Sequence, residues 1–580
     1  METSGGDVIA SALKKRGTRH IFTLCGGHIS PILVGCRRAG IAVIDVRDEV
    51  NAVFAADAAA RLTGLPGVAA VTAGPGVTNT ITALKNAQMA QSPMILIGGA
   101  AATFIKGRGS LQDIDIIPML DSVVKMAVSI NRNCDIVPAL DRAFTVAQSD
   151  VPGPVFLECP IDLLYGEEIV RQWYGKASGV TQSVNLKSKL FQFYLARRLD
   201  RMFACDFDET TLAEWQPIEY SFDASKVKKA AQTLNRSRKP VLIVGSQAML
   251  NPGESTRLAQ AVAALGIPTY LTGMARGLLG AVHSVHMRHH RKQALQSADL
   301  VLVAGMPCDF RLGYGRSIGT EATLVSVNRS KADLNLNRKP DIGILSDPHQ
   351  FLCALAEQKG LDPGIWHDWL ETLLQADRKR EQQIDTQSAE ATAGINPLRF
   401  FRILDRFLEP ESVIVADGGD FVATASYILR PRSPLSWLDP GVFGTLGVGA
   451  GFALGAGLCR PQHDIWLIYG DGAAGYSLQE FDTFVRHGIP VIAIVGNDGS
   501  WAQIARDQVE ILRDDVGTVL RRTDYHRVVE GFGGKGFLLD QEEDIETVLE
   551  AALETARKGT PVLINAMIGK TDFRKGSLSM

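Results

Sequence analysis

The sequence predicts an α/β protein that consists of three open parallel-sheet domains. Apolar runs such as GVAAV and PVLIV are continuous rather than alternating, which is typical of parallel strands that helices cover on both faces. Each run ends in small residues and leads into a segment of helix length, as in repeated strand-helix-strand units. The chain of 580 residues is also too long for one ordinary core.

Changes in this alternation predict the domain boundaries. The predicted parts are a first α/β domain (1–165), a linker (166–224), a second α/β domain (225–357), a helical connector (358–396), a third α/β domain (397–570) and a tail (571–580). The first domain begins with an amphipathic helix that carries Val8, Ile9, Ala12 and Leu13 on one face. The linker contains the amphipathic stretch KLFQFYLARRLDRMF, which we interpret as a helix packed on its own protein, with a docking or lid helix as the alternative.

Each domain contains several expected strands. These lie at HIFTLCGG, IAVIDVRDE, GVAAVTAGPG, SPMILIGGA and GPVFLECP in the first domain, at PVLIVGS, IPTYLTG, ADLVLVAG and ATLVSVNR in the second, and at SVIVADGG, HDIWLIYGDG, PVIAIVGND and PVLINAMIG in the third. The first and third domains have similar patterns, which indicates a duplication. Ligands of such sheets bind beyond the carboxyl ends of the strands.

Composition excludes several classes of partner. A net charge of -3 with interleaved charges gives no basic field for nucleic acid. The N-terminus has no signal pattern. The uncharged run Pro440 to Cys459 is too rich in glycine for a membrane span, and we expect this run to form a turn followed by a tightly packed helix. The eight scattered cysteines are expected to be reduced core residues. We therefore expect a cytoplasmic protein without membrane contact.

Acidic residues follow two strands of the third domain. IWLIYGDG ends in Asp471, and VIAIVGND returns to deliver Asn497 and Asp498. A right-handed crossover places these strand ends side by side, so their oxygens converge on a hard cation such as Mg2+ that in turn bridges a phosphate or diphosphate. Between them, Ser477 and Glu480 are expected to form a capping box for a helix that Gly488 closes.

The GDG segment followed by an Asn-Asp pair resembles the metal signature of thiamin diphosphate enzymes. The resemblance covers essentially the whole chain and implies a pyrimidine-binding first domain, a central domain and a diphosphate-binding third domain. It implies metal ligation by Asp471, Asp498 and the carbonyl of Ser500. Asp498 stands where the family usually has asparagine, which leaves Asn497 as an alternative ligand.

Further segments carry the same resemblance. GVFGTLGVGAGFALGA is similar to the segment beneath the cofactor, which implies that Leu446 is the apolar wedge that bends thiamin diphosphate and that Gly444 and Leu446 offer backbone contacts to its pyrimidine. ADGGDF occupies the place of a turn that contacts the diphosphate. The remaining cofactor contacts implied are Gly418, Gly419, Asp420, Gly472, Ala473 and Trp501.

The first domain supplies the implied acid. IAVIDVRDEVNAVFAADAAARLTG matches the family's strand-helix element, in which a glutamate, here Glu49, bonds the pyrimidine nitrogen and promotes the imino tautomer. A helix cap is the ordinary alternative for such a glutamate, but its position ahead of AGPGVTNT favours catalysis. In this family the glutamate and the diphosphate domain come from different chains, which implies a homodimer or homotetramer.

The closest resemblance is to the acetolactate synthase-like branch, which includes 2-hydroxyacyl-CoA lyases. His28 and Gln112 match active-site residues of benzaldehyde lyase, another member, and both can exchange a proton with a substrate hydroxyl or carbonyl. The leading hypothesis is a lyase that splits a 2-hydroxyacyl-CoA to an aldehyde or ketone and formyl-CoA, and that acts in reverse as a carboligase. The alternatives are an acetolactate synthase, which usually has a tryptophan where this chain has Asp507, and an inactive cofactor-binding subunit, against which Glu49 speaks.

Two regions stay open at this level. For the central domain the sequence leaves four alternatives: it binds FAD, ADP or the nucleotide of CoA, or it binds no ligand. Arg311 and the basic run RHHRK (288–292) can bind an anion, although a solvated helix face is the favoured interpretation of the run. The tail is a possible active-site lid that would bring Arg574 near a substrate phosphate.

Overall fold

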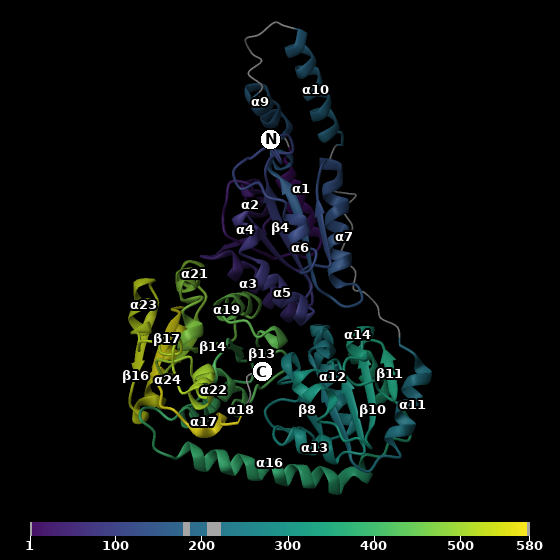
Figure 1. Cartoon of the computed structure of the whole chain (residues 1–580), viewed down its shortest axis with the longest axis vertical. Coiled ribbons are helices and arrows are strands. Elements are labelled where there is room, and N and C mark those ends of the chain that lie inside the picture. Colours follow the sequence, from purple (N-terminus) through teal and green to yellow (C-terminus); the bar gives the residue numbers. More distant parts are fainter. Residues whose placement is uncertain (1–2, 178–185, 206–221, 577–580) are drawn as a thin grey trace. The chain divides into compact units, whose positions relative to one another are not determined.

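The computed structural model describes residues 3–177, 186–205 and 222–576 (Figure 1). The chain divides into two compact units, residues 1–60 with 65–218 and residues 61–64 with 219–580. No helix in the described ranges is both long enough and apolar enough to cross a membrane.

The first unit contains one six-stranded parallel sheet in the order β2-β1-β3-β4-β6-β5. Its strands are β1 (His20–Thr23), β2 (Ala42–Asp45), β3 (Gly67–Val71), β4 (Met94–Ala100), β5 (Met126–Ser129) and β6 (Pro154–Pro160). Its helices are α1 (Gly5–Lys15), α2 (Ser30–Arg38), α3 (Glu49–Thr63), α4 (Pro75–Thr78), α5 (Ile81–Ala90), α6 (Ile116–Leu120), α7 (Ile136–Gln148), α8 (Ile161–Leu164), α9 (Glu167–Ala177) and α10 (Leu186–Met202).

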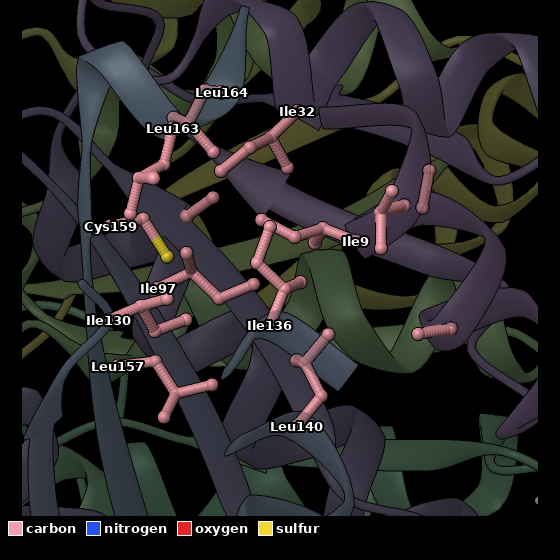
Figure 2. Packing of buried hydrophobic residues seen from close by; sticks show 14 of the residues in the cluster. Ile9, Ile32, Ile97, Ile130, Ile136, Leu140, Leu157, Cys159, Leu163 and Leu164 are labelled. Atoms are coloured by element: carbon pink, nitrogen blue, oxygen red, sulfur yellow. The ribbon is translucent and has the colours of Figure 1, made fainter. Parts of the chain in front are cut away.

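Helices α1, α2 and α7 cover one face of this sheet. Ile9 of α1 and Leu140 of α7 point toward Ile97 of β4, and all three side chains are buried (Figure 2). The apolar face predicted for α1 is confirmed, because Val8, Ile9, Ala12 and Leu13 are buried there. Burial of such aliphatic side chains contributes about 2 kcal/mol each and holds the helices on the sheet.

The predicted linker helix is α10. Its C-terminal half packs Leu195, Leu199 and Met202 into the core of the first unit, which agrees with a helix packed on its own protein. Leu190 and Phe193 in its N-terminal half are exposed. Residues 178–185 and 206–221 of the predicted linker lie outside the described residues.

The second unit contains two parallel sheets, in the orders β11-β10-β9-β7-β8 and β13-β12-β14-β15-β17-β16. The strands of the central sheet are β7 (Pro240–Val244), β8 (Thr269–Leu271), β9 (Leu300–Ala304), β10 (Thr323–Asn328) and β11 (Ile342–Leu345). Those of the third sheet are β12 (Val413–Ala416), β13 (Trp437–Leu438), β14 (Ile465–Gly470), β15 (Val491–Asn497), β16 (Lys535–Leu539) and β17 (Val562–Met567).

The helices of this unit include the expected connector, α16. They are α11 (Ala224–Leu234), α12 (Ser255–Leu265), α13 (Arg291–Ser297), α14 (Lys331–Leu334), α15 (Pro348–Ala356), α16 (His367–Ser388), α17 (Pro397–Phe407), α18 (Asp420–Ile428), α19 (Val448–Cys459), α20 (Asp471–Ala474), α21 (Phe481–His487), α22 (Ala502–Leu512), α23 (Tyr525–Gly531) and α24 (Ile545–Arg557). The turn and packed helix predicted for Pro440 to Cys459 are confirmed by α19, whose first ten residues are all buried.

The predicted fold class is confirmed, because the described residues contain three open parallel sheets, each covered by helices. The first and third sheets have the same strand order, with β12 in the place of β1 and β14 in that of β3, as the predicted duplication requires. Four strands escaped prediction, β5, β11, β13 and β16, and all four lie at sheet edges. They are also short: β5 and β11 have four residues each, β13 has two and β16 has five, so their apolar runs are too brief to predict a strand.

Two local expectations are wrong. The Ser477 side chain does not cap its helix, because its hydroxyl instead bonds the hydroxyl of Tyr469 at 2.9 Å. The αL closure at Gly488 is confirmed by its φ of 62°. Cys134 and Cys205 form a disulfide rather than standing as reduced core residues, because η1 (Asn133–Asp135) lies against the segment after α10. Cys25 is exposed.

The basic run at residues 288–292 is not a solvated helix face. Glu381 of α16 accepts hydrogen bonds from Arg288 and His289, both at 2.8 Å, and from Arg402 at 2.7 Å. Arg288 also donates to three backbone carbonyls, those of Tyr427, Ile428 and Leu429. These bonds join the central sheet's loop, the connector helix and the third domain, and they hold the pKa of Glu381 well below its usual range despite burial of the carboxyl group, which acts in the opposite direction.

Replacing Glu381 by glutamine should destabilise the protein, because it removes the negative charge and one of the two acceptor oxygens while leaving Arg288 and Arg402 in place. Loss of one partner from a buried ionic cluster costs about 3 kcal/mol. Differential scanning calorimetry should show a lower unfolding midpoint than in wild type. Glu357→Gln is the matched control, since that side chain is 69% exposed beside Arg257. Equal midpoints for the two variants would contradict the role of this cluster.

Candidate active site

The third sheet ends at a cavity of about 460 Å³. It lies at the carboxyl ends of β12, β14 and β15, which are neighbours in the sheet. The predicted cofactor and metal residues of this domain all line it: Gly418, Gly419, Asp420, Gly444, Leu446, Asp471, Gly472, Ala473, Asp498, Ser500 and Trp501. The structure therefore brings together at one cavity the residues that the sequence placed in separate segments.

Asp471 is buried at the start of α20, and its carboxylate accepts three backbone hydrogen bonds. Oδ1 accepts from Gly472 N at 2.8 Å, and Oδ2 accepts from Gly499 N at 2.7 Å and from Ser500 N at 3.2 Å. Burial raises the pKa of Asp471. The pKa of Asp498 rises to about 7, first because of burial and then because of the nearby negative charge of Asp471. Two carboxyl groups held together in this way suit a divalent cation.

Asp498 and the neighbouring Asn497 have different surroundings. Asp498 lines the cavity, whereas Asn497 does not. The amide of Asn497 donates to the carbonyl of Thr523 and to Oδ1 of Asn565, both at 3.0 Å. The geometry therefore favours Asp498 over Asn497 as the ligand of a cation in the cavity. The described part of the chain has no group of three or more acidic, histidine or cysteine side chains that could hold a metal. A metal bound by these two carboxylates would therefore need another ligand, such as a backbone oxygen.

Two helix N-termini open onto the same cavity. The residue before α18 is Gly419 and the residue before α22 is Trp501, and neither side chain caps its helix. Free N–H groups and the positive end of the helix dipole favour an anion there. Gly419 has a φ of 113°, which favours glycine, and a Cβ at Gly470 would lie 3.0 Å from the carbonyl of Gly418. This part of the cavity therefore fits a diphosphate.

Leu446 lies directly over the turn after β12. A Cβ at Gly418 would lie 2.2 Å from the Leu446 Cδ2 atom, so only glycine leaves room for this contact. The preceding Gly444 has a φ of 65°. The arrangement places an apolar side chain at the cavity between the two predicted contact segments, as expected for a wedge.

Sequence reasoning missed Asp417, the acid directly before the two cavity glycines. Its carboxylate accepts from Gly447 N at 2.9 Å and from Gly449 N at 2.7 Å. Burial raises its pKa to about 7, against the two hydrogen bonds that lower it. The only sequence signal is an acid at the end of an apolar strand, in the ADGGDF segment, of which only Gly418, Gly419 and Asp420 are predicted contacts.

The described part of the tail lies against Asp420 through Arg574. Asp420 forms an ion pair with Arg506, and the Arg574 Nε atom lies 4.0 Å from the same carboxylate. The Arg574 guanidinium also lies 5.1 Å from the ring centre of Tyr427. Residues 577–580 lie outside the described residues, so the lid function stays a prediction.

The first unit holds Glu49 at the start of α3. Its side chain is buried, and Oε2 accepts from the Asn79 amide at 3.1 Å. A Cβ at Gly76 would lie 3.5 Å from Oε1, so the glycine keeps space beside this oxygen. Asn79 was not predicted, although it belongs to the quoted AGPGVTNT motif. Glu49 is thus fixed through one oxygen, with the other left available.

His28 lies in the same cluster of the first unit. Its Nδ1 atom is 3.3 Å from the hydroxyl of Thr72, and Thr72 in turn contacts the backbone at Gly76 beside Glu49. Burial lowers the pKa of His28, so the ring is neutral at pH 7 and able to take up a proton. Gln112 has a φ of 63°. Its backbone lies over Gly74, because a Cβ at Gly74 would be 2.7 Å from the Gln112 backbone carbonyl oxygen.

The sequence matches one enzyme family over three segments. Residues 3–119 match the family described as "Thiamine pyrophosphate enzyme, N-terminal TPP binding domain", residues 227–355 match its central domain and residues 417–566 its C-terminal TPP binding domain. The chain belongs to the thiamine pyrophosphate (thiamin diphosphate) enzymes, and it is a thiamin diphosphate-dependent enzyme.

Similar proteins agree over the full length. The chain is 47% identical over 584 residues to 2-hydroxyacyl-CoA lyase 2 of Bos taurus, with 99% of this chain and 92% of that protein covered. It is 46% identical to 2-hydroxyacyl-CoA lyase 2 of Homo sapiens, with the same coverage. It is 32% identical over 563 residues to a probable acetolactate synthase of Mycobacterium bovis, with 97% and 95% covered. The resemblance stated from the sequence motifs is confirmed.

Substituting Gly472 by alanine should impair the cavity, because the new Cβ would lie 2.4 Å from the indole ring of Trp501. Overpacking of this kind costs about 1 to 3 kcal/mol, and the same free energy taken from cofactor binding corresponds to an affinity about 5-fold to 150-fold lower. Titration of thiamin diphosphate followed by protein fluorescence measures this affinity. Gly475→Ala is the control, since the atom nearest to its Cβ lies at 3.4 Å. Unchanged affinity in Gly472→Ala would contradict the described packing.

Proposed function

We propose that the protein is a thiamin diphosphate-dependent 2-hydroxyacyl-CoA lyase. It cleaves a 2-hydroxyacyl-CoA to an aldehyde or ketone and formyl-CoA, and it acts in reverse as an acyloin-type carboligase. The observation that carries this proposal is the 46 to 47% identity, over 99% of the chain, to proteins named 2-hydroxyacyl-CoA lyase 2. Both halves of a thiamin diphosphate site are present in the chain, one in each unit, and they support an active enzyme.

The cofactor, when bound, supplies a nucleophilic carbon and stabilises the electron pair left by carbon-carbon cleavage. The chain's own residues bind and orient it. The α18 and α22 N-termini would hold the diphosphate, Leu446 would support the cofactor from below, and Glu49 would share a proton with the pyrimidine nitrogen through its Oε1 atom. Asn79 keeps the Glu49 carboxylate in one orientation through its bond to Oε2.

His28 and Gln112 are proposed to act on the substrate. The neutral imidazole of His28 takes the proton of the 2-hydroxyl group during cleavage and returns it in the carboligation direction. The Gln112 amide donates a hydrogen bond to the carbonyl oxygen. Its positive φ fixes the loop that carries it above Gly74.

Mg2+ is the proposed metal. The donor set is made of oxygens only, the carboxylates of Asp471 and Asp498 and the carbonyl of Ser500, which is the chemistry a hard cation prefers. A cation there would neutralise two carboxyl groups whose pKa values burial raises, and it would link them to the diphosphate. The carboxylate at position 498 adds one negative charge relative to the usual asparagine.

A second anion site is proposed in the central domain. A cavity of about 530 Å³ contains no acidic residue in its lining and is bordered by Arg276, Arg288, Arg291, Lys292, Arg311 and Arg380. Burial lowers the pKa of Arg288, but only to about 10, so it stays charged at pH 7. Such a cavity suits the phosphates of a nucleotide, either the CoA of the substrate or a resident ADP or FAD.

A homodimer or homotetramer is the proposed assembly. α22 has no buried residue, and large apolar side chains at and after it are exposed near the cofactor cavity, among them Ile504, Ile511, Leu512, Val516 and Val519. Exposed apolar patches of this kind are typical of protein interfaces. A second chain covering α22 would exclude water from the cavity.

The alternatives have less support. An acetolactate synthase would decarboxylate pyruvate and join the fragment to a second keto acid, and the similarity to such a protein is lower, at 32% identity. An inactive cofactor-binding subunit would not need a buried glutamate with one oxygen left available in the first unit.

The function is tested by assaying the purified protein with thiamin diphosphate and Mg2+ on 2-hydroxyacyl-CoA substrates of different length and on pyruvate. Formyl-CoA release is expected, and Glu49→Gln should lower its rate at least about 100-fold because proton transfer is lost. Glu411→Gln, whose side chain is 74% exposed, is the control. Acetolactate from pyruvate alone would favour the synthase, and bound cofactor without turnover would favour the inactive subunit.

Mg2+ affinity should depend on pH. The pKa of Asp498 is raised to about 7 in the metal-free protein, and a ligand must lose its proton before it binds. Affinity therefore rises through pH 7 and falls by about tenfold per pH unit below it. Fluorescence titrations with Mg2+ at pH 6, 7 and 8 check this at saturating thiamin diphosphate. Asp498→Asn should flatten the dependence, and a wild type without any pH dependence would refute the assignment.

A further inference from the structure

Helix α19 begins without a cap of its own. The residue before it is Gly447, which has a φ of 88° and no side chain to bond the free N–H groups of the first turn. Acceptors from other segments replace the missing cap. Asp417 accepts from Gly447 N and Gly449 N, and the Ser477 hydroxyl accepts from Ala450 N at 3.4 Å. The start of α19 is therefore fixed from outside the helix, mainly by one carboxylate.

The residue just before this start is Leu446. Its side chain lies over Gly418, where a Cβ would be only 2.2 Å from Leu446 Cδ2. Asp417 and Gly418 are adjacent, so the turn after β12 meets the segment before α19 at two successive points. The Asp417 carboxylate accepts the backbone N–H groups of Gly447 and Gly449. The Leu446 side chain packs against the backbone of Gly418. A shift of Leu446 thus requires breaking the bonds to Asp417.

Stability alone does not explain an acid at this position. Asp417 is buried, and among the described residues the groups that act on its carboxyl are the two backbone N–H donors, with no lysine or arginine. A buried carboxylate without a counter-ion disfavours folding, and the pKa raised to about 7 by burial expresses that cost. Asparagine has the same shape and would avoid the charge. It cannot replace the acid fully, however, because its NH2 group would face one of the two N–H donors.

The surroundings leave no freedom to this carboxylate. A Cβ at Gly449 would lie 2.7 Å from Asp417 Oδ2 and 2.6 Å from the ring of Tyr469, so Gly449 is needed for the acid to approach. A longer glutamate has no space in the same place. The hydroxyl of Tyr469 bonds Ser477, which fixes the ring on the other side of Gly449.

We propose that Asp417 is a positioning residue of the active site, whose two backbone hydrogen bonds fix the Leu446 turn and thereby the bend of bound thiamin diphosphate. The proposal rests on the role proposed for Leu446. Asp417 belongs to the lining of the cavity, but both of its carboxylate oxygens accept backbone N–H groups, so its proposed action runs through the segment that it holds. Loss of one of its two hydrogen bonds would let Leu446 move away from the cofactor while the fold is kept.

The test is Asp417→Asn, studied as the full chain with thiamin diphosphate and Mg2+. The rate at which the thiazolium C2 proton of bound cofactor exchanges with deuterium reports the bend, because the pyrimidine amino group must lie against this carbon. We expect exchange at least about tenfold slower than in wild type, with thermal unfolding and cofactor affinity changed far less. A merely structural role would instead lower the unfolding midpoint or weaken cofactor binding, and it would leave the exchange rate of bound cofactor unchanged.

Two further variants separate the possible outcomes. Asp299→Asn removes a carboxylate that likewise accepts backbone N–H groups, those of Arg238 and Lys239, and should leave exchange unchanged. Leu446→Ala should slow exchange as Asp417→Asn does. If Leu446→Ala has no effect, the role proposed for Leu446 fails. If Leu446→Ala slows exchange and Asp417→Asn does not, the inference about Asp417 is overturned.

A measurement on the unaltered protein applies if Asp417→Asn does not fold. Amide hydrogen exchange should show Gly447 and Gly449 strongly protected even without cofactor, because both N–H groups are buried and bonded to the carboxylate. Fast exchange at these two amides would overturn the inference.

Discussion

In the third domain, β12, β14 and β15 lie next to one another and run in the same direction, so their carboxyl ends meet at one edge of the sheet. Each end carries a different part of the site. β12 leads to Asp417 and two glycines, β14 leads to Asp471, and β15 leads to Asp498. Because a parallel sheet fixes the distance between neighbouring strands at about 4.8 Å, these groups cannot separate. The proposed binding of cofactor and metal at this edge depends on this constraint.

The same constraint holds two carboxyl groups close together, and the proposed cation would neutralise their charge. Asp471 and Asp498 lie close together in a buried place, and the pKa of both carboxyl groups is raised by burial. Backbone N–H groups at Asp471 and the open N-termini of α18 and α22 offset part of the negative charge. The proposed divalent cation and a diphosphate would complete the charge balance, since each would neutralise the other. The loaded site is therefore expected to be more stable than the empty one.

The sequence predicts the central strands and the site at their ends well. Continuous apolar runs mark buried parallel strands, and the right-handed crossover rule brings Asp471 and Asp498 together without knowledge of the structure. Edge strands such as β16 (KGFLL) escape because solvent on one side permits polar and charged residues. Asp417 escapes for another reason: its partners, Gly447 and Gly449, lie far along the chain, and no local pattern connects them.

Some local signals mislead because tertiary contacts compete with them. Ser477 and Glu480 have the spacing of a capping box, yet the Ser477 hydroxyl bonds Tyr469, and Glu480 accepts from Thr483. The run that contains Arg288 has the composition of a solvated helix face, yet Arg288 forms a hydrogen bond with Glu381, which lies on a helix far along the chain. The pairing of Cys134 with Cys205 depends on where α10 ends, which spacing alone cannot give.

The most direct test of the account is the position of the metal. A crystal structure of the protein with thiamin diphosphate and Mn2+ in place of Mg2+ would locate the ion by its anomalous signal. The account predicts an ion within bonding distance of the carboxylates of Asp471 and Asp498, the carbonyl of Ser500 and the diphosphate. An ion held instead by Asn497, or one bound away from the ends of β14 and β15, would contradict it.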